Sequence, residues 1–175
     1  VRPLPVISPE AVERMIGAIQ QEIVARQARG AHPSSLLVVR RDLFIVLFLR
    51  DRANRVGDLE HMHLVEGAPP EPSASVDDPI HGYLSTTAPF AYRVRTKPGT
   101  IDRAQVPIEA RAAWLDYLAL RQQLGFDSPW LLVSDEGDHL CPGMVTLRIA
   151  HWAKRAGFHM TAQDFRRVFV TEELD

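Results

Sequence analysis

The sequence predicts one domain of the α+β class, mainly helical, with a small antiparallel β-sheet. Apolar residues recur at helical spacing along several segments, and two short alternating runs flank a turn at Pro98-Gly99. With 175 residues, 46% of them apolar and 24% charged, the chain is long enough for one hydrophobic core and hardly long enough for two. We therefore expect residues 1–175 to fold as a single unit.

The helices are predicted from capping residues and apolar spacing. Ser8 is expected to cap the first helix, with Pro9 in its first turn and Gly30 at its end. Helix 36–49 is apolar almost all round, so it should be the core helix. Further helices are predicted from about 56 to 63, over 109–124 with Ala112, Leu115, Leu118 and Ala119 facing inward, over 144–156 and over 161–173.

Strands are predicted in the middle of the chain. Segments 90–96 and 101–108 should pair as a hairpin around the Pro98-Gly99 turn, and 130–133 should be a short buried strand. Segment 66–79 is rich in Pro and Ser, so we expect it to be a mobile surface loop inserted within the domain.

Composition excludes several classes of protein. No run of about 18 apolar residues occurs, so no membrane association is expected. The single cysteine, Cys141, fits a reducing compartment. No glycine-rich phosphate loop and no convincing metal-ligand cluster occur; His61 and His63 are interpreted as structural or surface residues, and no cofactor or metal is expected. The start at Val1, without Met, suggests a fragment of a longer protein.

The basic residues are informative by type and by place. Net charge is −2, but the stretches 93–103 and 148–167 are locally basic. Only two of the 20 basic residues are lysines, Lys97 and Lys154. Lysine can release a proton near neutral pH in suitable surroundings, whereas arginine cannot. Lys97 is therefore a candidate for proton chemistry, and Lys154 is interpreted as an ordinary residue of a helix surface.

Four local patterns follow one another in a recognisable order. They are an opening helix over 7–15, an Arg55–Asp58 motif over 53–59, a lysine hairpin over 95–100 and a second-arginine region over 152–167. Together they resemble the catalytic domain of tyrosine recombinases, the phage integrase family. The resemblance covers nearly the whole chain, although each pattern alone is unspecific.

The resemblance implies a tyrosine-recombinase-like fold and a set of catalytic residues. Arg55 and Arg166 would clamp one phosphate of double-stranded DNA, because a guanidinium donates two parallel hydrogen bonds to phosphate. Asp58 would orient Arg55, and Lys97 would act as the general acid that protonates the leaving 5′ oxygen. No metal or nucleotide is required.

Other positions depart from the family or extend the DNA contact. Gln163 stands where the family usually has His, so it can donate a hydrogen bond but cannot act as an acid or base. Arg167 replaces another common His. DNA contacts are expected from Arg95, Arg148, Arg155 and Arg167.

The family's nucleophilic tyrosine has no counterpart among these residues. Tyr83, Tyr92 and Tyr117 fall in the wrong segments, so this chain cannot form the 3′-phosphotyrosyl intermediate by itself. Either the tyrosine lies in a longer protein, or the protein is a degenerate relative that binds DNA without cutting it. Family members assemble as tetramers on DNA, whereas we expect this fragment to be a monomer. The expected location is the cytoplasm of a bacterial or phage-infected cell, or the nucleus of a eukaryote.

A second hypothesis needs no catalysis. Helices 144–156 and 161–173, joined at Gly157, would form a helix-turn-helix that binds DNA through arginines such as Arg148 and Arg155. Taken singly, the candidate residues also have plain interpretations: Arg55 and Asp58 as a surface ion pair, Lys97 as a solvated turn residue, and Arg166 and Arg167 as an exposed helix face.

Overall fold

The fold was analysed in a computed structural model that describes residues 7–51, 56–97 and 99–165. Its elements, in chain order, are α1 (Pro9–Ala28), α2 (Pro33–Asp51), α3 (Val56–Glu60), β1 (Met62–Val65), β2 (Gly82–Ser85), β3 (Ala91–Lys97), β4 (Thr100–Gln105), α4 (Ile108–Gln123) and α5 (Met144–Arg155).

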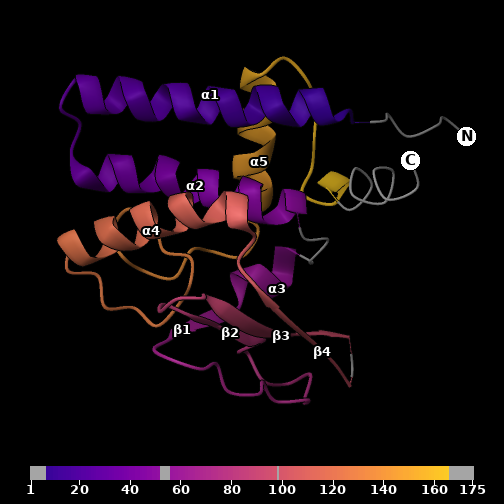
Figure 1. Ribbon diagram of the computed structural model, residues 1–175. Helices are drawn as coiled ribbons and strands as arrows, with labels where there is room; N and C mark the ends of the chain where they lie inside the picture. The colour runs from indigo at the N-terminus through magenta and orange to yellow at the C-terminus, as the bar shows by residue number, and fades with distance from the viewer. Residues whose placement is uncertain (1–6, 52–55, 98, 166–175) are drawn as a thin grey trace, which may run out of the picture.

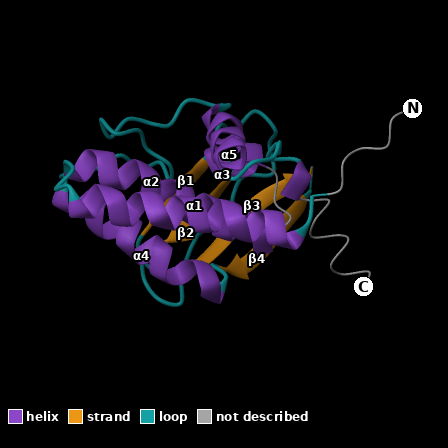
Figure 2. Cartoon of the chain, turned by 90° about the horizontal axis from the view of Figure 1, so that it is seen from above, coloured by secondary structure: helices purple, strands orange, loops and turns teal. Residues whose placement is uncertain are grey.

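The helices form a layer on one side of a four-stranded sheet. Figure 1 shows α1, α2 and α4 one below another above the sheet, and Figure 2 shows the same helices lying across the strands from above. The helix α5 packs against α1 and α2. Segment 66–81 runs along the side of the sheet that faces away from the helices (Figure 1). The predicted class, mainly helical with a small sheet, agrees with this arrangement.

The first two helices follow the expected pattern closely. The Ser8 hydroxyl accepts a hydrogen bond from the Ala11 N–H at 3.1 Å, which confirms the predicted cap of α1. Nearly all of α2 from Leu43 to Leu49 is buried, so it is the core helix that its composition predicted. No helix in the described ranges is long and apolar enough to cross a membrane.

The buried face of α4 differs from the prediction. Ala112, Leu115 and Ala119 are exposed, and Leu115 keeps 49% of its surface accessible. The aromatic face with Trp114 and Tyr117 is buried instead. This orientation removes more apolar area from water than the predicted one, since two large aromatic side chains enter the core.

The sheet is mixed rather than purely antiparallel. Its order is β1-β2-β3-β4; β2–β3 and β3–β4 are antiparallel, as the predicted hairpin requires, but β1 pairs with β2 in parallel. Met62 and His63, predicted on a helix, are the first residues of β1. Segment 130–133 forms no regular strand: it joins β1 only through an isolated bridge between His63 and Trp130.

Gly82 allows β2 to lie against β3. A Cβ at this position would come within 2.3 Å of the Arg93 carbonyl oxygen and 2.7 Å of the Val94 Cα, far closer than real contacts. The residue before it, His81, accepts a backbone hydrogen bond from Arg95 through its carbonyl. A glycine is therefore required where this chain enters the sheet.

Candidate functional site

The short helix α3 is the structural centre of the candidate site. It begins directly after residues 52–55, so Arg55 itself lies outside the described residues. The helix contacts both β3 and α5. It therefore links the strand that ends in Lys97 with the helix that leads to the second-arginine region.

Asp58 is buried within this helix and has a histidine partner. Its side chain is only 9% exposed, and its Oδ1 lies 3.1 Å from His81 Nδ1. A carboxylate oxygen accepts, so the imidazole donates. The predicted role, orienting Arg55, concerns a residue that is not described; the observed contact with His81 was not anticipated from the sequence.

Two more histidines donate to the same helix. His61 Nδ1 lies 2.7 Å from the Gly57 carbonyl oxygen, and His139 Nε2 lies 2.7 Å from the Glu60 carbonyl oxygen. The rings of His61 and His81 stack with centroids 4.7 Å apart. Among the described residues no group of three or more His, Cys, Asp or Glu side chains is arranged to hold a metal ion.

The Trp130 ring packs against two histidine rings, those of His139 and His63. It stacks on His139 with centroids 3.9 Å apart and almost parallel planes, and it meets His63 edge to face at 4.3 Å. Burial, and to a lesser extent the neighbouring His139, lowers the pKa of His63, which keeps this imidazole neutral.

The backbone around Trp130 is held by α4. The Arg121 guanidinium donates to the carbonyl oxygens of Ser128, Trp130 and Leu131 at 2.7–2.9 Å. The Tyr117 hydroxyl donates to the Leu131 carbonyl at 2.8 Å and accepts from the Val133 N–H. Segment 130–133 is not a regular strand. Its backbone groups therefore form hydrogen bonds with these side chains instead of with a neighbouring strand.

Lys97 ends the predicted hairpin strand, whereas Gln163 lies in a turn rather than on the helix predicted over 161–173, most of which lies outside the described residues. Lys97 is the last residue of β3 and pairs across the hairpin with Thr100; its side chain is outside the described part. Gln163 is exposed, while its neighbours Ala162 and Phe165 are buried. The turn that presents Gln163 is therefore anchored by apolar contacts. Arg166 and Arg167 lie outside the described residues.

Arg95 is not available as the predicted DNA contact. It is 7% exposed, and its guanidinium donates to the carbonyl oxygens of Ser73, Ser75 and Asp78. The alternation along β3 directs Tyr92 and Val94 into the core and Arg95 toward the opposite side, where segment 66–81 lies. Arg95 ties this segment to the sheet, and the mobility expected for segment 66–79 stays a prediction.

The arginines of α5 also have internal partners. Arg148 Nε donates to Asp42 Oδ2 at 2.8 Å, and Asp42 is almost completely buried in α2. Arg155 pairs with Glu22 of α1 at 3.4 Å and lies over the Trp152 ring. Arg148 therefore serves to dock α5, whereas Arg155 remains half exposed.

Two of the three tyrosines lie in the core of the domain. Tyr92 and Tyr117 are buried, and burial raises the pKa of Tyr117. A buried neutral phenol that donates to a carbonyl oxygen is a poor nucleophile. Tyr83 lies in β2, where its ring meets the edge of His63.

The arrangement is that of a recombinase-like fold. It is similar to the crystal structure of XerA recombinase, with a TM-score of 0.64, 21% sequence identity, and coverage of 98% of this chain and 52% of that chain. At this identity the likeness establishes the fold alone, and this chain spans about half the length of that structure. No protein-family model matches the sequence, and no curated protein matches it.

Proposed function

We propose that this chain is the DNA-binding and catalytic part of a tyrosine-type site-specific recombinase. The observation that carries the proposal is the position of α3, which contacts both the strand ending in Lys97 and the helix preceding the second-arginine region. The similarity in fold to a recombinase over nearly the whole chain supports it. The ordered sequence patterns resemble the same family.

The proposed chemistry is an exchange of phosphodiester bonds without a metal. Arg55 and Arg166 hold the non-bridging oxygens as negative charge builds on them, and Gln163 adds a hydrogen bond. A tyrosine hydroxyl loses its proton to solvent as its oxygen attacks the phosphorus and forms a phosphotyrosyl bond. The bond to the 5′ oxygen breaks, and Lys97 gives a proton to that leaving oxygen and regains one from solvent. Tyr92 and Tyr117 are buried, and by the family resemblance neither they nor Tyr83 lie in the segment that carries the nucleophile. The proposal therefore requires a tyrosine outside these 175 residues, or the protein binds DNA without cutting it.

Two measurements test the proposal. The binding of a fluorescent DNA duplex is compared by anisotropy for the wild type, Arg55→Ala and a charge-matched control, Arg29→Ala. Arg29 lies at the far end of α1 and is exposed. Loss of a phosphate contact should weaken binding about tenfold for Arg55→Ala only. Equal behaviour of the two variants would reject the phosphate clamp.

Strand cleavage is tested with a nicked suicide duplex and the full-length protein. A covalent protein–DNA adduct that disappears in Lys97→Ala, but not in Lys154→Ala, supports the recombinase mechanism. If wild-type protein binds the duplex through Arg55 and forms no adduct, the protein is a DNA-binding module related in fold to recombinases.

A further inference from the structure

We propose that His61, His81 and His139, here named the histidine cluster, are positioning residues that hold α3 in the orientation in which Arg55 meets DNA. The inference rests on the proposed function, because it assigns these residues a role in that site. None of the three was singled out as functional by the sequence.

The cluster contacts α3 at three different residues. His61 donates to the Gly57 carbonyl oxygen, His81 to the Asp58 carboxylate, and His139 to the Glu60 carbonyl oxygen, at 2.7, 3.1 and 2.7 Å. Each acceptor can only accept, so each imidazole must carry its proton on the contacting nitrogen. One N–H per ring is enough, and neutral histidines satisfy every contact.

The helix α3 needs such external support. It has five residues, fewer than an isolated helix requires, and its ends leave backbone groups without helical partners. The Glu60 carboxylate adds a fourth tie by accepting from the Gly143 N–H at 2.8 Å, where α5 begins. The orientation of α3 therefore depends on contacts made by side chains.

The histidine cluster is itself rigid. His61 stacks on His81 and meets the edge of His139 at 6.1 Å, and Trp130 stacks on His139. Trp130 is fixed in turn by the hydrogen bonds from Arg121 to its backbone. The support thus extends from α4 through Trp130 and the cluster to α3.

The experiment compares variants that keep or lose the donor. His81→Asn retains a donor near the Nδ1 position, whereas His81→Phe keeps the ring shape and loses the donor. His159→Asn, at an exposed site outside the cluster, is the control. The readouts are duplex affinity, hydrogen exchange of the amides of residues 57–61, and the melting temperature.

We expect a local effect on α3 and on DNA binding, without a loss of global stability. His81→Phe should lose about tenfold in duplex affinity and exchange its α3 amides about tenfold faster at pH 8, with a nearly unchanged melting temperature. His81→Asn, which retains a donor, should match the wild type in both affinity and exchange.

Failure of the inference and failure of the proposed function give different results. If Arg55→Ala weakens binding while His81→Phe matches His159→Asn in both affinity and exchange, the inference is overturned and the proposed function stands. If Arg55→Ala binds DNA as the wild type does, the proposed function fails. Hydrogen exchange of α3 then decides alone: faster exchange in His81→Phe retains the cluster as the support of α3, and unchanged exchange rejects it.

Discussion

Asp42 is the buried charge on which the packing of α2 against α5 depends. Its Oδ1 accepts from the Arg41 guanidinium, and its Oδ2 accepts from Arg148 Nε and Trp152 Nε1, both at 2.8 Å. Arg41 is also buried and donates to the Val133 carbonyl oxygen. The carboxylate therefore balances two arginines, only one of which reaches solvent.

Asp42→Ala should lower the free energy of unfolding by about 3–5 kcal/mol, because it leaves a buried guanidinium without its counter-charge. Urea denaturation followed by circular dichroism measures the change. The matched control is Asp116→Ala, whose partner Arg40 lies 2.8 Å away but whose own side chain is 53% exposed; this variant should lose less than about 1 kcal/mol. Similar losses in the two variants would show that the Asp42 network contributes no more than a surface ion pair.

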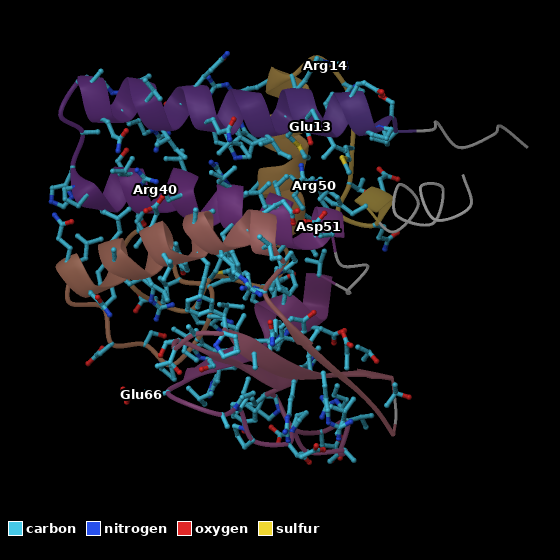
Figure 3. All side chains as sticks on the ribbon, in the orientation of Figure 1. Glu13, Arg14, Arg40, Arg50, Asp51 and Glu66 are labelled. Atoms are coloured by element: carbon cyan, nitrogen blue, oxygen red, sulfur yellow. The ribbon has the colours of Figure 1, made fainter. Side chains whose placement is uncertain are left out.

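Asp51, at the end of α2, is the carboxyl group for which pH matters most clearly. Burial raises the pKa of Asp51, Arg50 opposes the rise, and the nearby Glu109 adds to it. Figure 3 shows Arg50 and Asp51 together at this end of α2, with Glu13 of α1 close to Arg50. The folded state therefore prefers the protonated form of Asp51 more than the unfolded state does.

The direction of the pH effect follows. Because the folded pKa is raised, this group adds stability at low pH, below its unfolded pKa, and that stability is lost as pH rises through the folded value. Asp51→Asn should raise the melting temperature at pH 7 and leave it nearly unchanged at pH 3.5. Thermal melts at the two pH values measure this, with the exposed Asp127→Asn as control. A larger gain at pH 3.5 than at pH 7 would contradict the assignment.

Segment 66–81 has three of its carbonyl oxygens bonded by one side chain, Arg95, whose guanidinium donates hydrogen bonds to them. Arg93 and Arg103 contact the segment through the carboxylate of the exposed Glu71. A lysine could not replace the planar guanidinium here, since it cannot reach three carbonyls in a fixed geometry.

Arg95→Ala should release this segment while the helices stay folded. We expect the backbone amides of residues 73–80 to exchange much faster, because the carbonyls that anchor the loop lose their donor. Hydrogen exchange followed by mass spectrometry measures it. Arg103→Ala, which removes only a surface pair, should leave these amides protected. If both variants exchange alike, Arg95 is not the anchor.

Local signals predicted the elements, and non-local pairing limited the prediction. The cap at Ser8 and the apolar run of α2 are encoded within a few residues, so both were recognised. The partner of β1 is β2, reached through a long connection without a turn signal, so neither β2 nor the parallel pairing was predicted. The face of α4 was predicted wrongly because apolar residues lie on both sides, and contacts with Phe44 of α2 and with segment 131–133 select the aromatic one.

In the candidate site, too, residues with a local sequence signal could be predicted, and contacts between distant residues could not. Arg55, Lys97 and Arg166 stand out because the patterns around them are contiguous in sequence. The contact between Asp58 and His81 joins residues 23 positions apart, and the support from Trp130 depends on hydrogen bonds from a helix earlier in the chain. Such contacts exist only in the folded chain, and a histidine with no motif around it gives no signal in the sequence.

The distribution of charge over the whole molecule limits where DNA can bind. In the two locally basic stretches, Arg93 and Arg103 are paired with Glu71, Arg95 is buried, and Arg148 is paired with Asp42. These guanidinium groups form ion pairs with acidic side chains or hydrogen bonds with carbonyl oxygens of the protein itself. We therefore expect the DNA-binding charge to lie at the end of the molecule where α3, the β3–β4 hairpin and the 161–165 turn occur, rather than on α5.

The salt dependence of DNA binding distinguishes that end from α5. Each phosphate contact contributes about 0.9 to the slope of log affinity against log salt concentration, because a bound cation releases a counterion from the duplex. Lys97→Ala should therefore reduce the slope by about 0.9, and the double variant Lys154→Ala with Arg155→Ala, which removes two exposed cations from α5, should leave it unchanged. Anisotropy titrations between 50 and 200 mM salt, about the range over which such slopes are resolved, measure both. The reverse outcome would place α5 on the DNA, because a counterion is released only where a cation contacts a phosphate. That result would favour the helix-turn-helix hypothesis over the recombinase arrangement.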